Sequence, residues 1–552
     1  MEILKNINIP QDLKHLDLNE LIGLSQELKD FVMEKTSVKK GHIESSLTVT
    51  ELTVALHYLL DTPRDALFWD VGHQAYIHKI LTGRKSQFYT NRNKNGLSGF
   101  PHIEESEYDL FTTGHSSTSI SAVAGIAFAN RLSGNAAKHV AVIGDGALTG
   151  GMAFEALNYL GEHNEDVLII LNDNNSAIDK NVGGLSAHAN YRDYFKSLGL
   201  NYLGETNGQN MMHLVPNLKT AIDEKGARVL RVITQGVKVP FSDSSSQLKG
   251  YTKSFIDKLS ELARANENIV AVSPAMLSGS GLDVFKNEFP KRCFDVGIAE
   301  QHAVTMSAGL AKAGKTPICH LYSTFSQRGM DQIIHDVALQ NLHVIFMLDR
   351  AGLVGSDGAT HHGVFDVAML SGIPNLQILA PASAAELSVM LEWAIDQNGP
   401  IIIRFPRTGG ALPALHIPKE IHANRMEQLT IGNGEIAVLN FGFLLGEIQE
   451  SLKEIAIDSV SLFNVRFAKS LSEIDLKQIA KHKVVWLIED SQKRGGVGEY
   501  LAQQLFELGY QGQYFHSGLP DTFIEHGTMQ ELYAQHDLTH LAFTKKLKIL
   551  IR

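Results

Sequence analysis

The stretch that decides the fold reads HVAVIGDGALTGGMAFEALNYLGEHNEDVLIILNDN and covers residues 139–174. Two apolar runs within it, residues 139–143 and 167–171, end in the tripeptides Gly-Asp-Gly and Asn-Asp-Asn. Apolar runs that end at turn residues predict buried parallel strands. If the two strands are neighbours in one sheet, Asp145 and Asn174 project from adjacent carboxyl ends, where an open α/β sheet forms its ligand crevice.

This pair of polar residues suits a magnesium ion. One anionic and one neutral oxygen match Mg²⁺, which keeps part of its water shell and takes few protein ligands. Glycines beside Asp145 let a phosphate approach the backbone, and the following helix presents its positive end to an anion. An ordinary strand-to-helix turn is the alternative, but the spaced Asn-Asp-Asn after a second strand argues against it. The stretch therefore predicts a metal and phosphate site.

Composition sets the class of protein. A chain of 552 residues is too long for one core and suggests about three domains. Its net charge of −11, without a basic stripe, argues against a nucleic-acid partner. Only Cys293 and Cys319 are present, so we expect no disulfide framework and a reducing cytoplasm. No signal or transit pattern begins the sequence and no apolar run approaches 18 residues, so we expect no membrane partner.

Three Gly-His pairs lie at junctions between expected elements. They are Gly41-His42, Gly72-His73 and Gly114-His115, the last followed by Ser116. A single loop histidine is usually only solvated, but three in similar contexts are harder to explain in that way. Histidines at helix starts can donate to diphosphate oxygens or relay protons near neutral pH.

The remaining pattern predicts an α/β fold with three domains. Spacing of three and four predicts an amphipathic helix over residues 18–35, and Thr48-x-x-Glu51 has the spacing of a capping box before an apolar helix that carries His57. A Ser-rich stretch, residues 239–250, is a candidate linker. We therefore expect domains at 1–244, 245–415 and 416–552, the first two doubly wound.

A second group of candidate residues lies in the middle domain. Glu300 begins a small-residue helix, where the helix dipole favours a carboxylate in any case. A buried glutamate there could instead hydrogen-bond an aminopyrimidine nitrogen and favour the tautomer that removes the thiazolium proton. Phe325 in STFSQR could stack on that ring, although a core aromatic is an equal alternative.

Eight segments of the sequence resemble a known family. The segments VGHQAYIHKILTGR, GHSSTSIS, GDGALTGGMAFEALN, FDVGIAEQHAVT, YSTFSQR, IHDVALQNL, DRAGLVGSDGATHHG and GLPDTFIEHGT are similar to the 1-deoxy-D-xylulose-5-phosphate synthases. These are thiamine-diphosphate enzymes of the transketolase superfamily. The resemblance implies a diphosphate-binding, an aminopyrimidine-binding and a transketolase C-terminal-type domain, a homodimer, Mg²⁺ and thiamine diphosphate. It also implies a transferase that decarboxylates pyruvate and joins the two-carbon unit to D-glyceraldehyde 3-phosphate, for isoprenoid, thiamine and pyridoxal precursors.

The resemblance also assigns roles by position. Asp145, Asn174 and the backbone oxygen of Ser176 match the metal ligands. The loops that face the cofactor contain His73, Gly114, His115, Ser116, Gly146, Ala147 and Asn174, together with Glu300 and Phe325 on the aminopyrimidine side. Glu300, His42 and His361 match the catalytic residues. The acceptor site is expected to contain Tyr322, Arg328, Arg350, Asp357 and Arg404, because guanidinium groups bind a phosphate dianion in a forked geometry. Surface ion pairs are the alternative for each arginine.

The sequence departs from the family beyond Leu185. The stretch between residues 186 and 250 is several tens of residues shorter than expected, and VITQGVKVPFSDSSS has no match to the family's Lys-Gly, Ala-Glu and His pattern. Asn-Gly-Gln replaces Asp-Gly-His at 207–209, Lys40 precedes Gly41, and Glu44 replaces a small residue. Two alternatives therefore stay open: a transketolase-like paralogue with another acceptor or donor, and a non-catalytic paralogue that only binds cofactor or partners.

Overall fold

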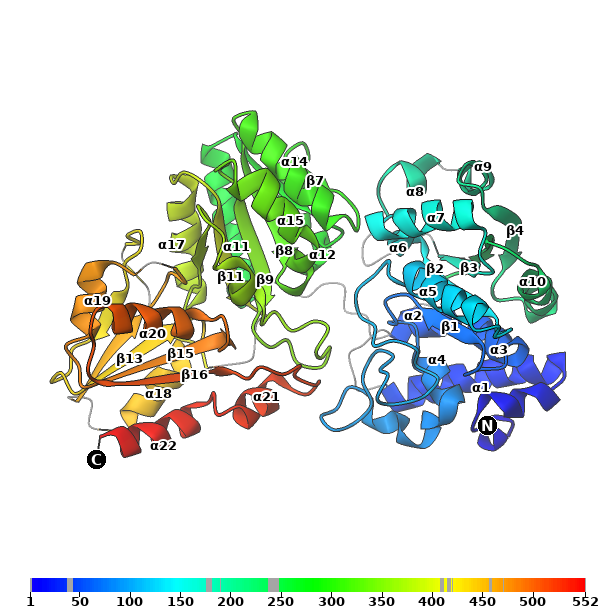
Figure 1. Cartoon of the computed structure of the whole chain (residues 1–552), viewed down its shortest axis with the longest axis horizontal. Coiled ribbons are helices and arrows are strands. Elements are labelled where there is room, and N and C mark those ends of the chain that lie inside the picture. The colour runs from blue at the N-terminus through cyan, green and yellow to red at the C-terminus, as the bar shows by residue number, and fades with distance from the viewer. Residues whose placement is uncertain are drawn as a thin grey trace. The chain divides into compact units, whose positions relative to one another are not determined.

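The computed structural model describes residues 2–36, 43–174, 181–188, 190–236, 248–407, 412–414, 418, 420–455, 459–469 and 471–551. The chain forms two compact units. The first contains residues 1–246 with 297–299, and the second contains residues 247–296 with 300–552 (Figure 1). His42 and Ser176, two predicted site residues, lie outside the described residues.

The first unit is built on a five-stranded parallel sheet with the order β1-β2-β3-β5-β4. The strands are β1 (Ala66–Trp69), β2 (His139–Gly144), β3 (Leu168–Asp173), β4 (Asn201–Asn207) and β5 (Arg228–Ile233). The helices are η1 (Leu4–Asn6), η2 (Pro10–His15), α1 (Leu18–Thr36), α2 (Ile43–Thr48), α3 (Thr50–Leu59), α4 (Tyr76–Lys79), η3 (Ile80–Arg84), η4 (Lys85–Thr90), α5 (Ser119–Leu132), α6 (Asp145–Leu148), α7 (Gly151–His163), α8 (Gly184–His188), α9 (Tyr191–Ser197) and α10 (Met211–Asp223).

Both faces of this sheet are buried, as its continuous apolar strands require. Val142 and Ile170 point to one face and join the core formed with α1, α3 and α10. Ile143 and Ile169 point to the other face and pack with α5 and α7. Because β2 and β3 are parallel neighbours, their polar ends lie at the same edge of the sheet, where the chain enters α6 and the segment after β3.

The second unit contains two further sheets. One has six parallel strands in the order β10-β11-β9-β8-β6-β7. Its strands are β6 (Ile269–Ser273), β7 (Cys293–Asp295), β8 (Thr316–Tyr322), β9 (Ile345–Ala351), β10 (Gln377–Leu379) and β11 (Ile401–Pro406). Its helices are α11 (Gly250–Ala265), α12 (Leu277–Ser280), α13 (Leu282–Glu288), α14 (Glu300–Lys312), η5 (Thr324–Gly329), α15 (Met330–Gln332), η6 (Ile333–Ala338), α16 (Asp366–Leu370) and α17 (Ala384–Ile395).

The third sheet is mixed, with the order β12-β14-β13-β15-β16 and β12 antiparallel to β14. Its strands are β12 (Glu427–Thr430), β13 (Ile436–Phe441), β14 (Val460–Asn464), β15 (Val484–Gln492) and β16 (Gln513–Leu519). Its helices are α18 (Leu445–Lys453), α19 (Glu473–Ile479), α20 (Val497–Glu507), α21 (Met529–Gln535) and α22 (His540–Leu550). Leu348 of β9 and Leu439 of β13 belong to one buried cluster, so the second and third sheets share a core.

The α/β class with three sheets is confirmed, as are the parallel neighbours β2 and β3 and the helix expected over 18–35. The capping box is wrong. Thr48 ends α2, and its hydroxyl donates to the carbonyl of Glu44 at 2.8 Å. The carboxylate of Glu51 pairs with Lys29 at 2.5 Å. His57 is fully buried on α3, as expected. The exact domain boundaries stay a prediction.

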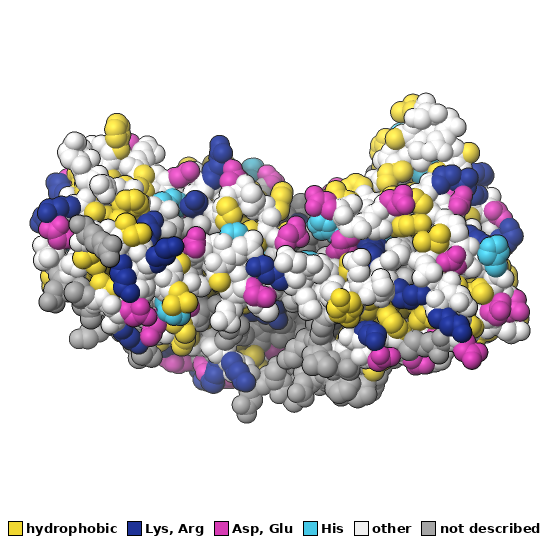
Figure 2. All heavy atoms as spheres, turned by 90° about the horizontal axis from the view of Figure 1, so that it is seen from below, with side chains coloured by type: hydrophobic (Ala, Val, Ile, Leu, Met, Phe, Trp, Pro, Cys, Tyr) yellow, Lys and Arg dark blue, Asp and Glu magenta, His cyan; other side chains and the backbone are white. Residues whose placement is uncertain are grey.

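The surface agrees with the sequence's balance of charge. On the face that Figure 2 shows, acidic and basic side chains of the described residues are interspersed, without a basic stripe. None of the helices that the structure describes combines the length and the apolar character needed to cross a membrane.

Candidate active site

The expected metal ligands lie together at the carboxyl edge of the first sheet. β2 and β3 pair in parallel with Gly144 opposite Asn172, so Asp145 and Asn174 follow adjacent strand ends. Both side chains line a cavity of about 560 Å³. Its other lining residues include Asp173, Asn181, Tyr191, Arg231 and Thr234. The arrangement predicted from the two tripeptides is therefore present in the described part of the site.

The surroundings of Asp145 would stabilise a bound cation. The amide of Asn181 donates to its Oδ2 at 2.7 Å, and the N–H of Gly146 donates to its Oδ1 at 3.0 Å. Burial, reinforced by the neighbouring carboxylate of Asp173, raises the pKa of Asp145 to about 7. Asp173 itself is paired with Arg231 at 2.6 Å. A bound cation would offset the cost of keeping Asp145 ionised next to a second carboxylate.

Nothing in the described residues points to a transition-metal site. No group of three or more His, Cys, Asp or Glu side chains there could hold a metal ion. The expected ligand set of one carboxylate, one amide oxygen and one backbone carbonyl is of a different kind, and is the kind that suits Mg²⁺.

Three loops at this edge are fastened to one another by hydrogen bonds. Asp70, which follows β1, accepts from the N–H of Ser117 at 2.7 Å and from the N–H of Ser119 at 3.0 Å. The hydroxyl of Ser117 then donates to the carbonyl of Ala147 at 2.7 Å. The loop with Gly114, His115 and Ser116 is thus tied to the ends of both β1 and β2.

The second Gly-His pair, Gly72-His73, is packed against the same loop. A Cβ atom at Gly72, whose φ is +81°, would lie 2.2 Å from the hydroxyl oxygen of Thr113 and 2.4 Å from a ring carbon of Pro101. Only glycine fits this approach. Burial lowers the pKa of His73 to about 4, so its imidazole is neutral at physiological pH.

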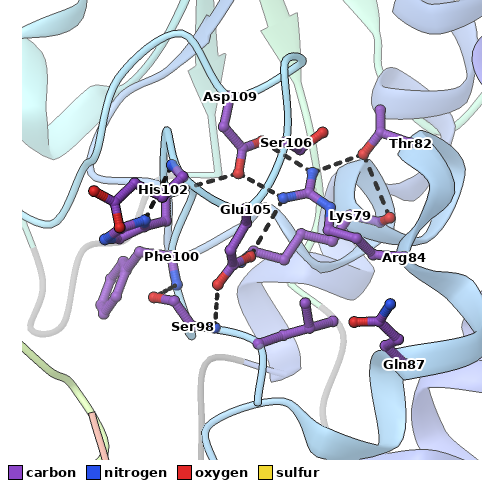
Figure 3. A network of polar contacts seen from close by, with 12 residues as sticks. Lys79, Thr82, Arg84, Gln87, Ser98, Phe100, His102, Glu105, Ser106 and Asp109 are labelled. Carbon is purple, nitrogen blue, oxygen red and sulfur yellow. Dashed lines mark hydrogen bonds and ion pairs between the residues drawn. The ribbon is translucent and has the colours of Figure 1, made fainter. Parts of the chain in front are cut away.

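A buried charge network holds the segment that leads into Gly114 (Figure 3). Asp109 accepts from Nε2 of His78 at 2.8 Å, from Nη2 of Arg84 at 2.9 Å and from the N–H of His102 at 2.8 Å. Burial alone would raise the pKa of Asp109, but the hydrogen bonds from His78 and Arg84 outweigh it and hold the pKa well below its usual value. Glu105, on the same segment, pairs with Lys79 and Arg84.

The second unit carries the other predicted residues at the carboxyl ends of its parallel sheet. Glu300 begins α14 and is 7% exposed. Its neighbour η5 packs against that helix, because a Cβ atom at Gly329 would lie 2.9 Å from Val304 and 3.6 Å from the carbonyl of Glu300. Burial raises the pKa of Glu300, with Arg328 acting in the opposite direction. Burial therefore favours the protonated form of this carboxyl group.

Aromatic and cationic side chains gather beside η5. The rings of Tyr322 and Phe325 stack with centroids 5.4 Å apart, and Phe325 meets His361 edge to face at 5.9 Å. The guanidinium carbon of Arg350 lies 3.9 Å from the centroid of the Tyr322 ring. Arg350 has a φ of +63°, a strained conformation for a non-glycine residue of the kind often found at functional sites.

The Tyr322 hydroxyl is available to a ligand. It is buried without a hydrogen-bond partner among the described residues, and burial raises its pKa. A Cβ atom at Gly279 would lie 2.4 Å from this oxygen. An unsatisfied buried hydroxyl costs free energy, so a substrate oxygen that supplies the missing hydrogen bond would be favoured.

Arg404 is held in a buried ion triad. Its side chain is 1% exposed, Nε donates to Asp366 at 2.8 Å, and Nη1 donates to Asp490 of β15. This buried ion triad joins the second and third sheets, so the assignment of Arg404 to the acceptor phosphate is corrected. Arg407, three residues further on, has a half-exposed side chain and faces Asp357 at 3.6 Å. Sequence reasoning missed it, although the run FPR carries the signal: a second arginine just past the strand end.

The Gly-rich segment GGVGEY before α20 is not an anion site. The carboxylate of Glu489 already accepts from the N–H groups of Val497 and Gly498, each at 3.1 Å. A Cβ atom at Gly496 would lie 2.6 Å from the same carboxylate. The glycines make room for the protein's own anion at the helix N-terminus.

The three sheets, the Asp145–Asn174 edge and the glutamate at the start of α14 define a transketolase-type chain. Sequence models of the transketolase pyrimidine-binding domain and the transketolase C-terminal domain match residues 249–411 and 429–541. A model described as 1-deoxy-D-xylulose-5-phosphate synthase matches residues 4–193.

Individual relatives agree on the family. Proteins named 1-deoxy-D-xylulose-5-phosphate synthase are 41% identical in Syntrophomonas wolfei, covering 97% of this chain and 94% of the relative, and 40% identical in Colwellia psychrerythraea, covering 99% and 98%. The Cytophaga hutchinsonii protein of that name is 40% identical, covering 97% and 96%. The chain therefore belongs to the 1-deoxy-D-xylulose-5-phosphate synthase family.

The relatives contain residues that this chain lacks. The alignment with the Colwellia protein runs over 620 positions, more than the 552 residues of the chain. The match to the family's N-terminal model ends at residue 193, shortly after the segment that follows β3. The next family model begins to match at residue 249.

Proposed function

We propose that this protein is a carboligase that decarboxylates pyruvate and joins its two-carbon unit to D-glyceraldehyde 3-phosphate. In the reaction, the bond between pyruvate C1 and C2 breaks and CO₂ leaves. A new bond forms between pyruvate C2 and the aldehyde carbon, and a proton is added to the aldehyde oxygen. The product, 1-deoxy-D-xylulose 5-phosphate, would feed isoprenoid, thiamine and pyridoxal precursor synthesis. The proposal is supported by membership of the family and carried by the Asp145–Asn174 pair beside the 560 Å³ cavity.

The residues present fit thiamine diphosphate with Mg²⁺. The raised pKa of Asp145 supports a cation next to it, and Gly144, where an added Cβ atom would meet nothing within 4 Å, leaves open space beside Asp145. Asp145, Asn174 and the backbone of Ser176 would hold the metal. The diphosphate would contact His73, Gly114, His115, Ser116, Gly146 and Ala147. When bound, the thiazolium supplies an electron sink that stabilises a carbanion, which protein side chains cannot provide.

Glu300 is the proposed proton-holding residue. Burial raises the pKa of Glu300 and so favours the protonated carboxyl group, which is the form that donates a hydrogen bond to a ring nitrogen. Phe325, held against Tyr322, offers a flat surface for that ring. His42 and His361 are proposed to move protons at the acceptor carbonyl oxygen.

The acceptor phosphate is proposed to bind Arg350 and Arg407, with Arg328 as a further cation. Arg350 stands over Tyr322, and Arg407 stands next to Asp357, so the two guanidiniums flank a tyrosine hydroxyl and a carboxylate that suit the sugar hydroxyls. Guanidinium groups keep their charge at any physiological pH and bind phosphate in a fork.

A homodimer is proposed for the assembly. Helices α5 and α7 expose large apolar side chains: Leu132 is 79% exposed, Phe154 50% and Tyr159 49%. Such a face on adjacent helices supports burial against a second copy. The two buried cysteines are free, which supports a cytoplasmic location.

Steady-state turnover with pyruvate, D-glyceraldehyde 3-phosphate, Mg²⁺ and thiamine diphosphate tests the proposal. The Glu300→Gln variant should bind the cofactor but lose about 10²–10⁴-fold in kcat, the range for a general acid–base residue. Turnover that does not depend on Glu300 contradicts the mechanism, and cofactor binding without any turnover in the native protein indicates a non-catalytic paralogue.

The identity of the acceptor needs a separate test, because the chain is shorter than its relatives. A transketolase-like paralogue with another acceptor is the alternative. A competition between phosphorylated and unphosphorylated aldehydes should show a strong preference for the phosphorylated ones. Equal use of both kinds of aldehyde contradicts the binding of the acceptor phosphate by Arg350 and Arg407.

A further inference from the structure

The loop between β9 and α16 is closed on itself at its base. Gly352 and Gly363 exchange two backbone hydrogen bonds of 2.8 Å each. Between them lie Asp357 and His361, two of the proposed acceptor and proton-transfer residues. We call residues 352–363 the acceptor loop. Its shape decides where those two side chains stand.

One arm of the acceptor loop is fastened to the domain built on the third sheet. The hydroxyl of Tyr533, in α21, accepts from the N–H of Leu353 at 3.1 Å, although 180 residues separate them in the chain. Tyr533 is 1% exposed, and its ring meets Phe443 edge to face at 5.7 Å. A Cβ atom at Gly352 would lie 2.9 Å from the tyrosine oxygen, so glycine is needed for this approach.

The other arm is fastened through His362. Its Nδ1 accepts from the N–H of Val354 at 3.0 Å, and its Nε2 donates to the carbonyl of Glu525 at 3.3 Å. Burial lowers the pKa of His362 to about 4, so the ring is neutral and offers one acceptor and one donor. The imidazole therefore links both arms of the loop to the segment that follows β16.

The tip of the loop packs on the same segment. Gly355 and Gly358 have φ values of +91° and +73°, and Cβ atoms there would lie 3.2 Å from the carbonyl of Gly527 and 3.2 Å from Cβ of His526. Leu353 and Val364, at the two stems, are buried in a hydrophobic cluster made mostly of residues from the third sheet's domain.

We propose that residues 525–533 form a brace that sets the shape of the acceptor loop, and that Tyr533 and His362 are positioning residues for the phosphorylated acceptor. Through the brace, the domain of the third sheet would contribute to acceptor binding, although the proposed catalytic residues lie in the domains of the other two sheets. The link to acceptor binding rests on the proposed function, whereas the brace itself rests only on the contacts.

The variant Tyr533→Phe, made in the full-length protein, tests the brace. It removes one oxygen and leaves the N–H of Leu353 buried without an acceptor. Hydrogen exchange measured by mass spectrometry should show residues 353–362 exchanging about tenfold faster, the size expected for one lost buried hydrogen bond. The KM for D-glyceraldehyde 3-phosphate should rise by a similar factor, with the KM for pyruvate and the Kd for thiamine diphosphate within about twofold.

Tyr514→Phe is the matched control, because its hydroxyl donates to the carbonyl of Gly498 at 2.7 Å within the same domain and away from the loop. It should leave both readouts unchanged. His362→Leu should reproduce the effect of Tyr533→Phe, and His362→Gln, which keeps an amide, should recover part of it.

The two readouts separate the proposals. Faster loop exchange in a protein without turnover supports the brace and contradicts the proposed function. Unchanged loop exchange in Tyr533→Phe and His362→Leu overturns the brace, as does an equal change in Tyr514→Phe. Faster exchange with an unchanged acceptor KM overturns the positioning role.

Discussion

The cofactor edge of the first unit and the acceptor loop of the second unit are built in different ways. At the cofactor edge, Asp70, Asp145 and Asn174 each follow a strand of the first sheet, and short polar contacts such as Asp70 with Ser117 tie neighbouring loops together. The acceptor loop is shaped by Tyr533 and Glu525, which lie more than 160 residues further along the chain. Local motifs therefore place Asp145 and Asn174 in the first region, whereas the second depends on a domain that carries none of the proposed catalytic residues.

The largest effect should come from Arg404→Met, which tests whether the second and third sheets are held together by the buried triad. Removing the guanidinium leaves Asp366 and Asp490 buried without their cation, at a cost of about 3–5 kcal/mol in the free energy of unfolding. Urea denaturation measures it. Arg407→Met, which breaks only a long and half-exposed pair, should cost less than about 1 kcal/mol. Equal losses of unfolding free energy in the two variants would contradict the structural role of the Arg404 triad.

The cofactor edge should respond to Asp145→Asn. Loss of the carboxylate should weaken Mg²⁺-dependent binding of thiamine diphosphate by about 10–100-fold, measured by calorimetry. Asp166→Asn is the control, since Asp166 precedes β3 at the opposite edge and pairs with Arg228 at 2.6 Å. Similar losses in both variants would show that general destabilisation, and not metal binding, explains the result.

The sequence predicted the placement of Asp145 and Asn174 for a physical reason. Asp145 and Asn174 each follow a buried strand, and parallel neighbours must bring such ends together. Arg404 could not be judged in the same way, because its partner Asp490 lies 86 residues away in another sheet. The capping box failed because Thr48 still belongs to α2, where its hydroxyl donates to the carbonyl of Glu44 one turn earlier, and Val49 is the N-cap of α3. Long-range partners decide these cases, and one sequence does not reveal them.

The pH dependence of stability tests the buried network of Asp109 with His78 and Arg84. The pKa of Asp109 is depressed in the folded protein, so its ionised form adds stability above the unfolded pKa near 4. That contribution, about 2 kcal/mol, should be lost as the pH falls toward the folded pKa. Unfolding free energies measured from pH 7 downward should therefore fall more steeply for the native protein than for Asp109→Asn. Parallel curves would contradict the role given to Asp109.

The smallest effect should be confined to the acceptor. Arg407→Met should raise the KM for D-glyceraldehyde 3-phosphate about tenfold, as expected for one charge-assisted contact, and leave the KM for pyruvate nearly unchanged. Unphosphorylated glyceraldehyde is the control, because it has no phosphate to lose. An equal rise in the KM values for both substrates would contradict the assignment of Arg407 to the phosphate site.

The most direct test of the whole account is the fate of labelled pyruvate. Pyruvate carrying ¹³C at C2 is incubated with D-glyceraldehyde 3-phosphate and the native protein, and the products are followed by NMR. The account predicts label at C2 of 1-deoxy-D-xylulose 5-phosphate, and only when Mg²⁺ and thiamine diphosphate are both present. Label that stays in pyruvate, or appears only in products without the acceptor's carbons, would contradict it.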